Sequence, residues 1–176
     1  MNLDYLAEYK IPVKGIKNGK HTFDFEVNKR FFEETGGTEI SDAALNVLVE
    51  LTKSTLITVM NINISGTVSV KCDRCLDTFN LALSGNYELY VKFTEAEEDE
   101  DDKIIFVPND THEIDMSEYI REFIILSLPL QKVHPDDEEG YSTCNPEMLD
   151  LLENFLVDEE PQSDPRWDEL KKFNKN

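Results

Sequence analysis

Cysteines, basic residues and long apolar runs are all scarce in this 176-residue chain. The three cysteines are an odd number, which argues against a disulfide-stapled secreted fold. The longest apolar run, residues 123–130, contains a serine and a proline and is far too short to span a bilayer. The first residues, M-N-L-D-Y-L-A-E-Y-K, lack the basic and apolar regions of a secretory signal. We therefore expect a soluble cytoplasmic protein with no membrane partner.

Positive charge is scarcest in the second half of the chain. Residues 1–94 carry 10 Lys or Arg against 12 Asp or Glu, whereas residues 95–176 carry 7 against 25. No lysine or arginine occurs from residue 133 to residue 165, and seven of the eight residues 95–102 are acidic. Such a field repels phosphate and attracts basic partners, so we do not expect non-specific nucleic-acid binding by this half. Solvated loops that aid solubility are the simpler explanation of acidic runs.

Sequence signatures of catalysis are missing as well. The chain contains no G-x-x-x-x-G-K phosphate loop, no G-x-S-x-G and no H-E-x-x-H. Its three histidines, His21, His112 and His134, are scattered over predicted turns and loops, where no base for a nucleophile is evident. We therefore predict a protein that is not an enzyme and has no small-molecule substrate.

The centre of the chain carries the clearest structural pattern. Apolar and polar residues alternate over 45–51, 60–72 and 79–93, which is the period of strands with one buried face. Gly66 predicts a bend or bulge within the second of these runs. The break between residues 72 and 78 predicts the end of a hairpin. Together these features predict an antiparallel meander.

Shorter patterns flank this meander. Residues 9–16 and 21–27 are predicted to be strands joined in a hairpin at Asn18-Gly19, a turn-forming pair. A short helix is predicted over 28–35, and another strand over 103–107. Further predicted features are a helix over 116–128, opened by a capping box of Asp115 and Glu118, a helix that starts at Asn145-Pro146, and a last docked segment over 164–173.

These elements predict an α+β fold in two parts. Residues 1–132 should form a β-rich domain, in which a mainly antiparallel, strongly curled sheet is covered by the 116–128 helix. Residues 133–176 should form an acidic C-terminal helical extension.

Two of the three cysteines, Cys72 and Cys75, lie in V-K-C-D-R-C-L at the predicted hairpin end. A C-x-x-C pair supplies two thiolates from one tight turn, which is half of a tetrahedral zinc site. His134 and Cys144 lie in one predicted loop and could complete a Cys3His metal site. The spacing lacks the second C-x-x-C of a zinc ribbon.

Two other interpretations of the pair stay open. The residues alone favour two reduced cysteines at a hairpin end, with Cys72 filling an apolar position of the strand. A redox pair is less favoured, because such pairs follow a strand and open a helix whose dipole lowers the thiol pKa, whereas both flanks here are strands. Arg74 is the one nearby charge that would favour a thiolate.

Basic residues mark two candidate RNA contacts. Lys71 and Arg74 flank the cysteine pair, and the first predicted hairpin carries Lys10, Lys14, Lys17 and Lys20. Ordinary charges on a solvent-exposed face explain both groups more simply, and charge alone favours that explanation.

Several motifs follow one another in a characteristic order. The block C-x-R-C-L follows I-S-G-T-V-S-V, and after the acidic loop come L-S-L-P at 126–129, His134 and Cys144, and D-P-R-W-D-E-L-K-K-F at 164–173. This order resembles the YceD family, the large ribosomal RNA subunit accumulation proteins of bacteria and plastids. The resemblance extends from residue 40 to the C-terminus.

The resemblance implies a non-enzymatic accessory role in large-subunit ribosomal RNA accumulation and ribosome biogenesis. Many relatives carry a second cysteine pair that suggests a metal site with the central pair, whereas here Cys144 stands alone and leaves His134 as the fourth ligand. The implied partner is a ribosomal precursor, reached through a basic ribosomal protein or through structured ribosomal RNA at Lys71 and Arg74. Electrostatics favour the basic protein.

Two alternative functions follow from the residues. The chain could be a metal- or thiol-dependent regulatory module that uses the C-x-x-C pair. It could also be an acidic protein-interaction module unrelated to ribosomes.

Overall fold

The computed structural model describes residues 3–36, 39–55, 57–94 and 104–155. The predicted acidic loop over 95–102 and the predicted docked segment over 164–173 lie outside these residues. In chain order the elements are α1 (Leu3–Leu6), η1 (Ala7–Tyr9), β1 (Lys10–Pro12), β2 (Gly19–Asn28), α2 (Lys29–Thr35), β3 (Asp42–Lys53), β4 (Thr58–Lys71), β5 (Thr78–Phe93), β6 (Ile104–Val107), β7 (Glu113–Asp115), α3 (Ser117–Ser127) and α4 (Pro146–Phe155).

The predicted meander of β3, β4 and β5 is confirmed. Alternate residues of these strands are buried, and their registers place Leu51 opposite Met60 and Met60 opposite Leu89. Gly66 has a φ of +141°, and a Cβ at this position would meet the carbonyl oxygen of Ala44 on the neighbouring strand. A side chain is therefore excluded there by the close approach of β3 to β4.

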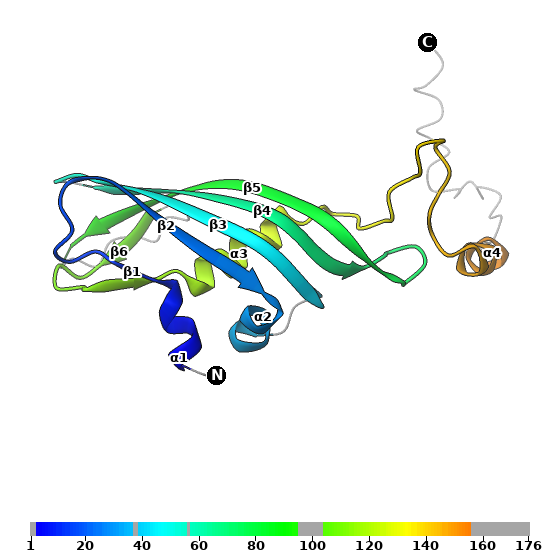
Figure 1. Ribbon diagram of the computed structural model, residues 1–176, viewed down its shortest axis with the longest axis horizontal. Helices are drawn as coiled ribbons and strands as arrows, with labels where there is room; N and C mark the ends of the chain where they lie inside the picture. The colour runs from blue at the N-terminus through cyan, green and yellow to red at the C-terminus, as the bar shows by residue number, and fades with distance from the viewer. Residues whose placement is uncertain (1–2, 37–38, 56, 95–103, 156–176) are drawn as a thin grey trace, which may run out of the picture.

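The main sheet differs from the prediction in direction and curvature. Its strand order is β2-β3-β4-β5-β6, and β6 runs parallel to β5, so the sheet is mixed. Strong curling is not confirmed either, and Figure 1 shows a long twisted sheet. The reason is that β2 and β6 remain at opposite edges and do not pair with each other, as closure would require.

The predicted hairpin at Asn18-Gly19 is wrong. β1 pairs with β7 in a second, two-stranded sheet, while β2 pairs along its whole length with β3. This arrangement lets β1 bury Ile11 against the core instead of extending the main sheet. The intervening loop is held by Lys53, whose Nζ donates to the backbone oxygens of Val13 (2.7 Å) and Ile16 (3.2 Å).

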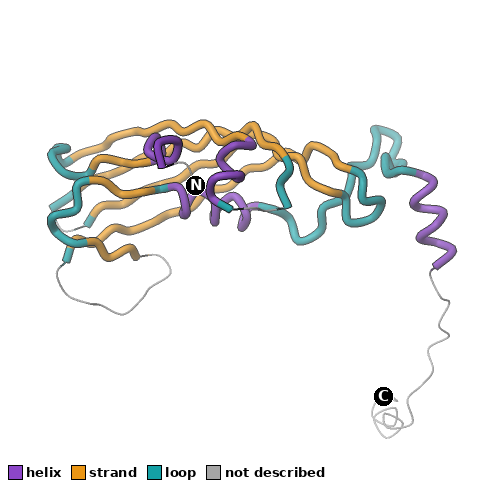
Figure 2. The backbone as a smooth tube through the Cα atoms, turned by 90° about the horizontal axis from the view of Figure 1, so that it is seen from below, coloured by secondary structure: helices purple, strands orange, loops and turns teal. Residues whose placement is uncertain are grey.

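Helices cover one face of the sheet (Figure 2). α3 places Met116, Ile120 and Ile124 fully in the core, as its apolar spacing predicts. Its capping differs from the predicted capping box, because the N-cap is Met116 and Asp115 Oδ1 accepts from the Ser117 backbone N–H at 2.9 Å. The helix predicted over 28–35 is present as α2 over 29–35, and Asn28 is its N-cap, with Oδ1 accepting from the Arg30 backbone N–H.

The end of the β4–β5 hairpin and α4 lie together at one end of the molecule, beyond the helices that cover the sheet (Figure 1). β4 and β5 are the longest strands, with 14 and 16 residues, and their hairpin reaches that end. Among the described residues, no helix has both the length and the apolar character needed to cross a membrane.

Candidate metal centre

The turn between β4 and β5 holds two cysteine sulfurs in the interior. The backbone N–H of Leu76 donates to Cys72 O at 3.0 Å, and Leu76 has a φ of +65° that reverses the chain. The Arg74 backbone N–H points at Cys72 Sγ, with N and S 3.4 Å apart. Cys72 and Cys75 are 0% and 1% exposed, so both thiols face inward from one tight turn.

Lys132 fixes the segment that carries the histidine. Its backbone N–H donates to Asp73 Oδ2 at 2.6 Å, and its backbone oxygen accepts from the Asp73 N–H at 2.7 Å. Its Nζ lies 3.2 Å from a Glu39 carboxylate oxygen and 3.7 Å from Asp73 Oδ1. The His134 ring then packs on Phe79 of β5, with the ring centroids 4.5 Å apart. These contacts bring the histidine to the end of the hairpin.

The loop after His134 turns back and delivers the third cysteine. Asp137 Oδ1 accepts from the backbone N–H groups of Glu139 and Tyr141, and the Thr143 hydroxyl donates to Pro135 O at 2.6 Å. These local bonds close the loop, so that Cys144 returns to the neighbourhood of His134. Asn145 then donates from its side-chain amide to Asp77 Oδ2 at 3.2 Å, which ties the loop to the hairpin turn.

The four predicted ligands converge on one point. Cys72 Sγ lies 3.7 Å from Cys144 Sγ, and the Nδ1 atom of His134 lies 3.4 Å from Cys75 Sγ and 3.7 Å from Cys144 Sγ. All four potential ligand atoms lie within 4.8 Å of one another. We call Cys72, Cys75, His134 and Cys144 the cysteine–histidine cluster. The structure therefore brings together every residue that the sequence proposed for metal binding.

Three of the six distances between the ligand atoms fit a tetrahedral zinc ion, and all six are within 4.8 Å. Zinc–ligand distances of about 2.3 Å to sulfur and 2.0–2.1 Å to nitrogen require S–S edges of about 3.8 Å and S–N edges of about 3.6 Å. The observed contacts of 3.7 Å between sulfurs, and of 3.4 and 3.7 Å between sulfur and nitrogen, match these edges. Three thiols and one imidazole also form a donor set that zinc prefers.

Hydrogen bonds lower the pKa of one thiol in the cluster. Burial raises the pKa of the Cys72 thiol, but the backbone N–H groups of Cys75 and Arg74, together with His134, outweigh burial and lower the pKa to about 6. Burial raises the pKa of Cys144, which lies beside Cys72. All three cysteines are reduced, and a metal cation would bind each of them as a thiolate and displace its proton.

The two candidate RNA-binding residues lie on the outside of the same turn. Lys71 is the last residue of β4 and Arg74 lies between the two cysteines, and both side chains are exposed. Asp73 and Asp77 share this turn, and they are bonded to Lys132 and Asn145 respectively. Lys71 and Arg74 thus form a small basic surface next to the cluster, and their role in binding stays a prediction.

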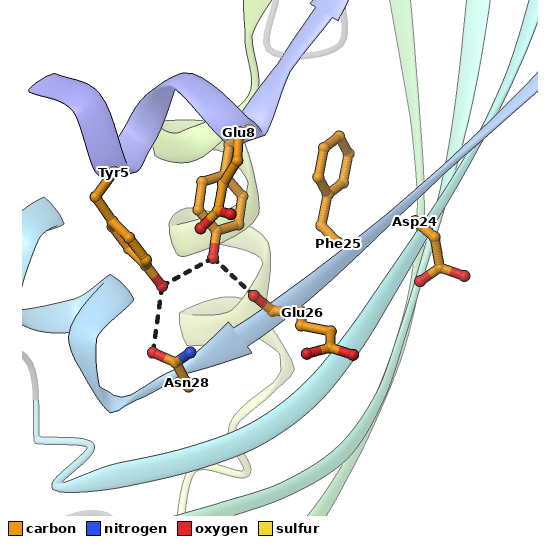
Figure 3. A pocket seen from close by; sticks show the side chains of 7 residues that line it. Tyr5, Glu8, Asp24, Phe25, Glu26 and Asn28 are labelled. Carbon is orange, nitrogen blue, oxygen red and sulfur yellow. Dashed lines mark hydrogen bonds between the residues drawn. The ribbon is translucent and has the colours of Figure 1, made fainter.

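A pocket of about 500 Å³ lies elsewhere, between α1, η1 and β2, and no sequence motif pointed to it. Its lining combines the carboxylates of Glu8, Asp24 and Glu26 with aromatic rings (Figure 3). The Tyr9 hydroxyl donates to the backbone oxygen of Glu26 at 2.7 Å, and burial raises the pKa of Tyr9. The Tyr5 hydroxyl lies 3.2 Å from that of Tyr9, so the hydrogen bonds of this pocket hold the N-terminal helix to the sheet.

Residues 60–174 match the family described as large ribosomal RNA subunit accumulation protein YceD. The chain belongs to the YceD family. The match begins in β4 and includes the hairpin, α3, the cysteine–histidine cluster and α4. No curated protein and no solved structure matches the chain.

YceD is named for ribosomal RNA accumulation and not for a reaction, so membership connects the chain with the large ribosomal subunit and assigns no catalytic residue. The four residues of the cluster were proposed from sequence, but the residues that hold their segments in place in this YceD protein were not. Asp73 and Lys132 are charged residues of ordinary appearance, separated by 59 positions, and nothing local indicates that they bond. Asn145 was predicted only as a helix cap, and it is also the partner of Asp77.

Proposed function

We propose that this YceD protein is a non-enzymatic accessory factor in the accumulation of large-subunit ribosomal RNA. In this proposal it binds a ribosomal precursor, in the first instance through a basic ribosomal protein. The observation that carries the proposal is the family match, which spans the cluster and the acidic residues that follow it. The charge of that acidic region is the argument for a basic protein as the partner.

The acidic segment, defined here as residues 133–155, suits a basic partner. It contains seven carboxylate side chains and no lysine or arginine. The charged residues of this segment are exposed to solvent. Long-range attraction of a cationic protein follows from this charge, whereas the phosphates of RNA would be repelled. The basic surface of Lys71 and Arg74 is the alternative route, by which structured RNA would be contacted directly.

A zinc ion would have a structural role in this proposal. Cys72, Cys75, His134 and Cys144 would hold it, and four protein ligands make a closed site. When bound, the ion supplies a cross-link between the β4–β5 hairpin and the acidic segment. The chain itself supplies the orientation of the ligands, through the Asp73–Lys132 bonds and the packing of the His134 ring against Phe79.

Ribosomal RNA profiles test the function. A strain that lacks this protein should contain less large-subunit ribosomal RNA relative to small-subunit RNA, and a plasmid copy of the wild-type chain should restore the ratio. Equal ratios in the deletion and parent strains would refute the proposed function.

Metal analysis tests the zinc site. Purified wild-type protein should contain about one equivalent of zinc, as four protein ligands predict. Cys75→Ser and His134→Ala should lose most of it. His112→Ala is the matched control, because His112 is an exposed histidine outside the cluster and should leave the zinc content unchanged. Wild-type protein that is expressed with ample zinc and still contains none would reject the site.

Co-purification tests the partner. Tagged protein should recover ribosomal proteins in a salt-sensitive way, because screening weakens attraction between exposed charges. Recovery of protein-free ribosomal RNA at low salt, lost in Lys71→Ala/Arg74→Ala, would instead support the RNA route and reject the basic-protein partner.

A further inference from the structure

Helix α4 displays an apolar surface that no described element covers. Leu151, Leu152 and Phe155 are 50%, 43% and 79% exposed, and no residue of the described helix is fully buried. Residues three and four positions apart lie next to one another on a helix, so Phe155 lies beside both Leu151 and Leu152 and the three side chains form one surface. We call them the α4 surface. Figures 1 and 2 show α4 standing beyond the end of the sheet.

The first turn of the same helix is anchored. Met148 and Leu149 are half-buried and pack against the core cluster of apolar side chains. Asn145 caps the first turn, with Oδ1 accepting from the Glu147 backbone N–H at 3.1 Å, while its amide bonds to Asp77 of the hairpin. Cys144 of the cluster comes immediately before this cap. The helix is therefore held at its beginning and presents its distal apolar residues to solvent.

Carboxylates occupy the opposite side of α4 and the loop that precedes it. Glu147, Asp150 and Glu153 lie on the helix at spacings of three residues, and the rest of the acidic segment adds four further carboxylates without any lysine or arginine. An apolar surface inside an anionic field selects against RNA, whose phosphates would face the carboxylates. It also selects against a second copy of this chain, which would bring an identical anionic helix.

We infer that the α4 surface is the docking site for a cationic amphipathic segment of a partner protein. Apolar side chains of that segment would cover Leu151, Leu152 and Phe155, while its lysines or arginines would be attracted by the field of the acidic segment. This is recognition of one amphipathic helix by the apolar face of another. The inference deepens the proposed function and rests on it, because it names the surface that would take the basic partner.

A peptide titration tests the apolar contribution. The probe is a labelled synthetic peptide of leucine and lysine at helical spacing, titrated with the full-length, zinc-loaded chain and followed by fluorescence anisotropy. Leu151→Gln/Phe155→Ser should weaken binding by about tenfold or more, because buried apolar anchors carry most of the affinity at such surfaces. Leu126→Gln is the matched control, since Leu126 is a 69% exposed leucine on α3 and should leave binding unchanged.

The same titration tests the charges. Asp150→Asn/Glu153→Gln should weaken binding several-fold at low salt and reduce its salt dependence. Unchanged zinc content and circular dichroism in each variant keep these results separate from misfolding. Equal affinities of wild type and Leu151→Gln/Phe155→Ser, with folding intact, would overturn the inference, because the peptide would then bind by charge alone.

Two measurements detect other occupants. The chain has a single tryptophan, Trp167, so its emission reports on the C-terminal segment. If Leu151→Gln/Phe155→Ser shifts that emission before peptide is added, the segment itself covers the α4 surface and the inference is wrong. Loss of a dimer in the same variant, by sedimentation velocity, would assign the surface to a second copy and would also overturn it.

Ribosomal RNA ratios separate this inference from the proposed function. If Leu151→Gln/Phe155→Ser loses peptide binding and lowers large-subunit RNA as the deletion does, both are supported. If binding is lost but RNA ratios stay normal even in the deletion strain, the docking site stands and the proposed function fails. If the deletion lowers the RNA and the variant restores it fully, the docking site is not the one used in the cell.

Discussion

At the scale of single residues, one side chain can satisfy two of the interpretations that the sequence left open. Cys72 continues the buried alternation of β4, as an ordinary core residue would. Its sulfur also lies 3.7 Å from that of Cys144, which places it in the cysteine–histidine cluster. A buried position in β4 is therefore compatible with membership of the cluster, and only a metal measurement separates a structural cysteine from a metal ligand.

Gly66 should be the glycine least tolerant of substitution. In Gly66→Ala the new Cβ would meet the backbone of Ala44 and Leu45, and the φ of +141° is unfavourable for any side chain. We expect urea unfolding to show a loss of about 2 kcal/mol or more in the free energy of unfolding. Gly140→Ala is the control, because it has a positive φ but open space, and should lose about 1 kcal/mol. Equal losses would contradict the steric explanation.

Asp73 should support the cluster without being a ligand. Asp73→Ala removes the acceptor for the Lys132 backbone N–H and one carboxylate near Lys132 Nζ, so the segment that carries His134 loses part of its attachment and keeps the backbone bond and the Glu39 contact. We expect zinc affinity to fall by about tenfold, as for other residues that orient metal ligands. Competition with a chromophoric chelator measures this, and Asp110→Ala, at an exposed aspartate outside the cluster, should have no effect. An unchanged affinity in Asp73→Ala would show that the cluster does not need this bond.

At the scale of elements, each helix has a different relation to the core. α3 buries one complete face, and its role is to cover the sheet. α4 contacts the core only through half-buried Met148 and Leu149, so most of its apolar area is left for other contacts. Both helices have an amphipathic pattern in the sequence, and the pattern alone does not reveal which one is fully docked.

Substitutions on the two sides of α3 should separate its buried and exposed faces. Ile120 is 0% exposed, and Ile120→Ala should lower the free energy of unfolding by about 2–5 kcal/mol through lost burial and the cavity it leaves. Leu126→Ala, on the exposed side, should change it by less than about 0.5 kcal/mol. Urea denaturation followed by circular dichroism measures both, and similar values would mean that α3 does not pack on the sheet as described.

At the scale of the whole molecule, charge and packing divide the chain in the same way. The sheet has a large apolar core, whereas the acidic segment carries seven carboxylates and no lysine or arginine of its own, so that its charges repel one another. The cluster and the Asn145–Asp77 bond are the contacts that hold this segment to the hairpin. A metal would therefore stabilise one end of the molecule more than the rest.

Metal removal should release the acidic segment before the sheet. With a chelator present, amide hydrogen exchange should become faster over residues 134–149, while protection in β3, β4 and β5 should change little. Mass spectrometry of peptides from the full-length chain measures both regions in one experiment. Uniform exchange before and after chelation in protein that had contained zinc would show that the ion does not anchor the segment.

Sequence alone determined which face is buried in the central strands and in α3. The alternation in β3–β5, the apolar stripe of α3 and the cap at Asn145 follow from local spacing, because each element buries one face in a period that its own residues set. The candidate ligands also followed, since thiols and imidazole are rare in this chain and few combinations were available.

Tertiary structure decided which elements meet. It gave β1 the partner β7, set β6 parallel to β5, and brought Cys144 to Cys72 across 72 positions. Local spacing cannot specify these choices, because they depend on the combined burial and hydrogen bonding of segments that are distant in the chain. The cluster depends on the same kind of contact, since the bond between Asp73 and Lys132 joins two segments that are 59 positions apart.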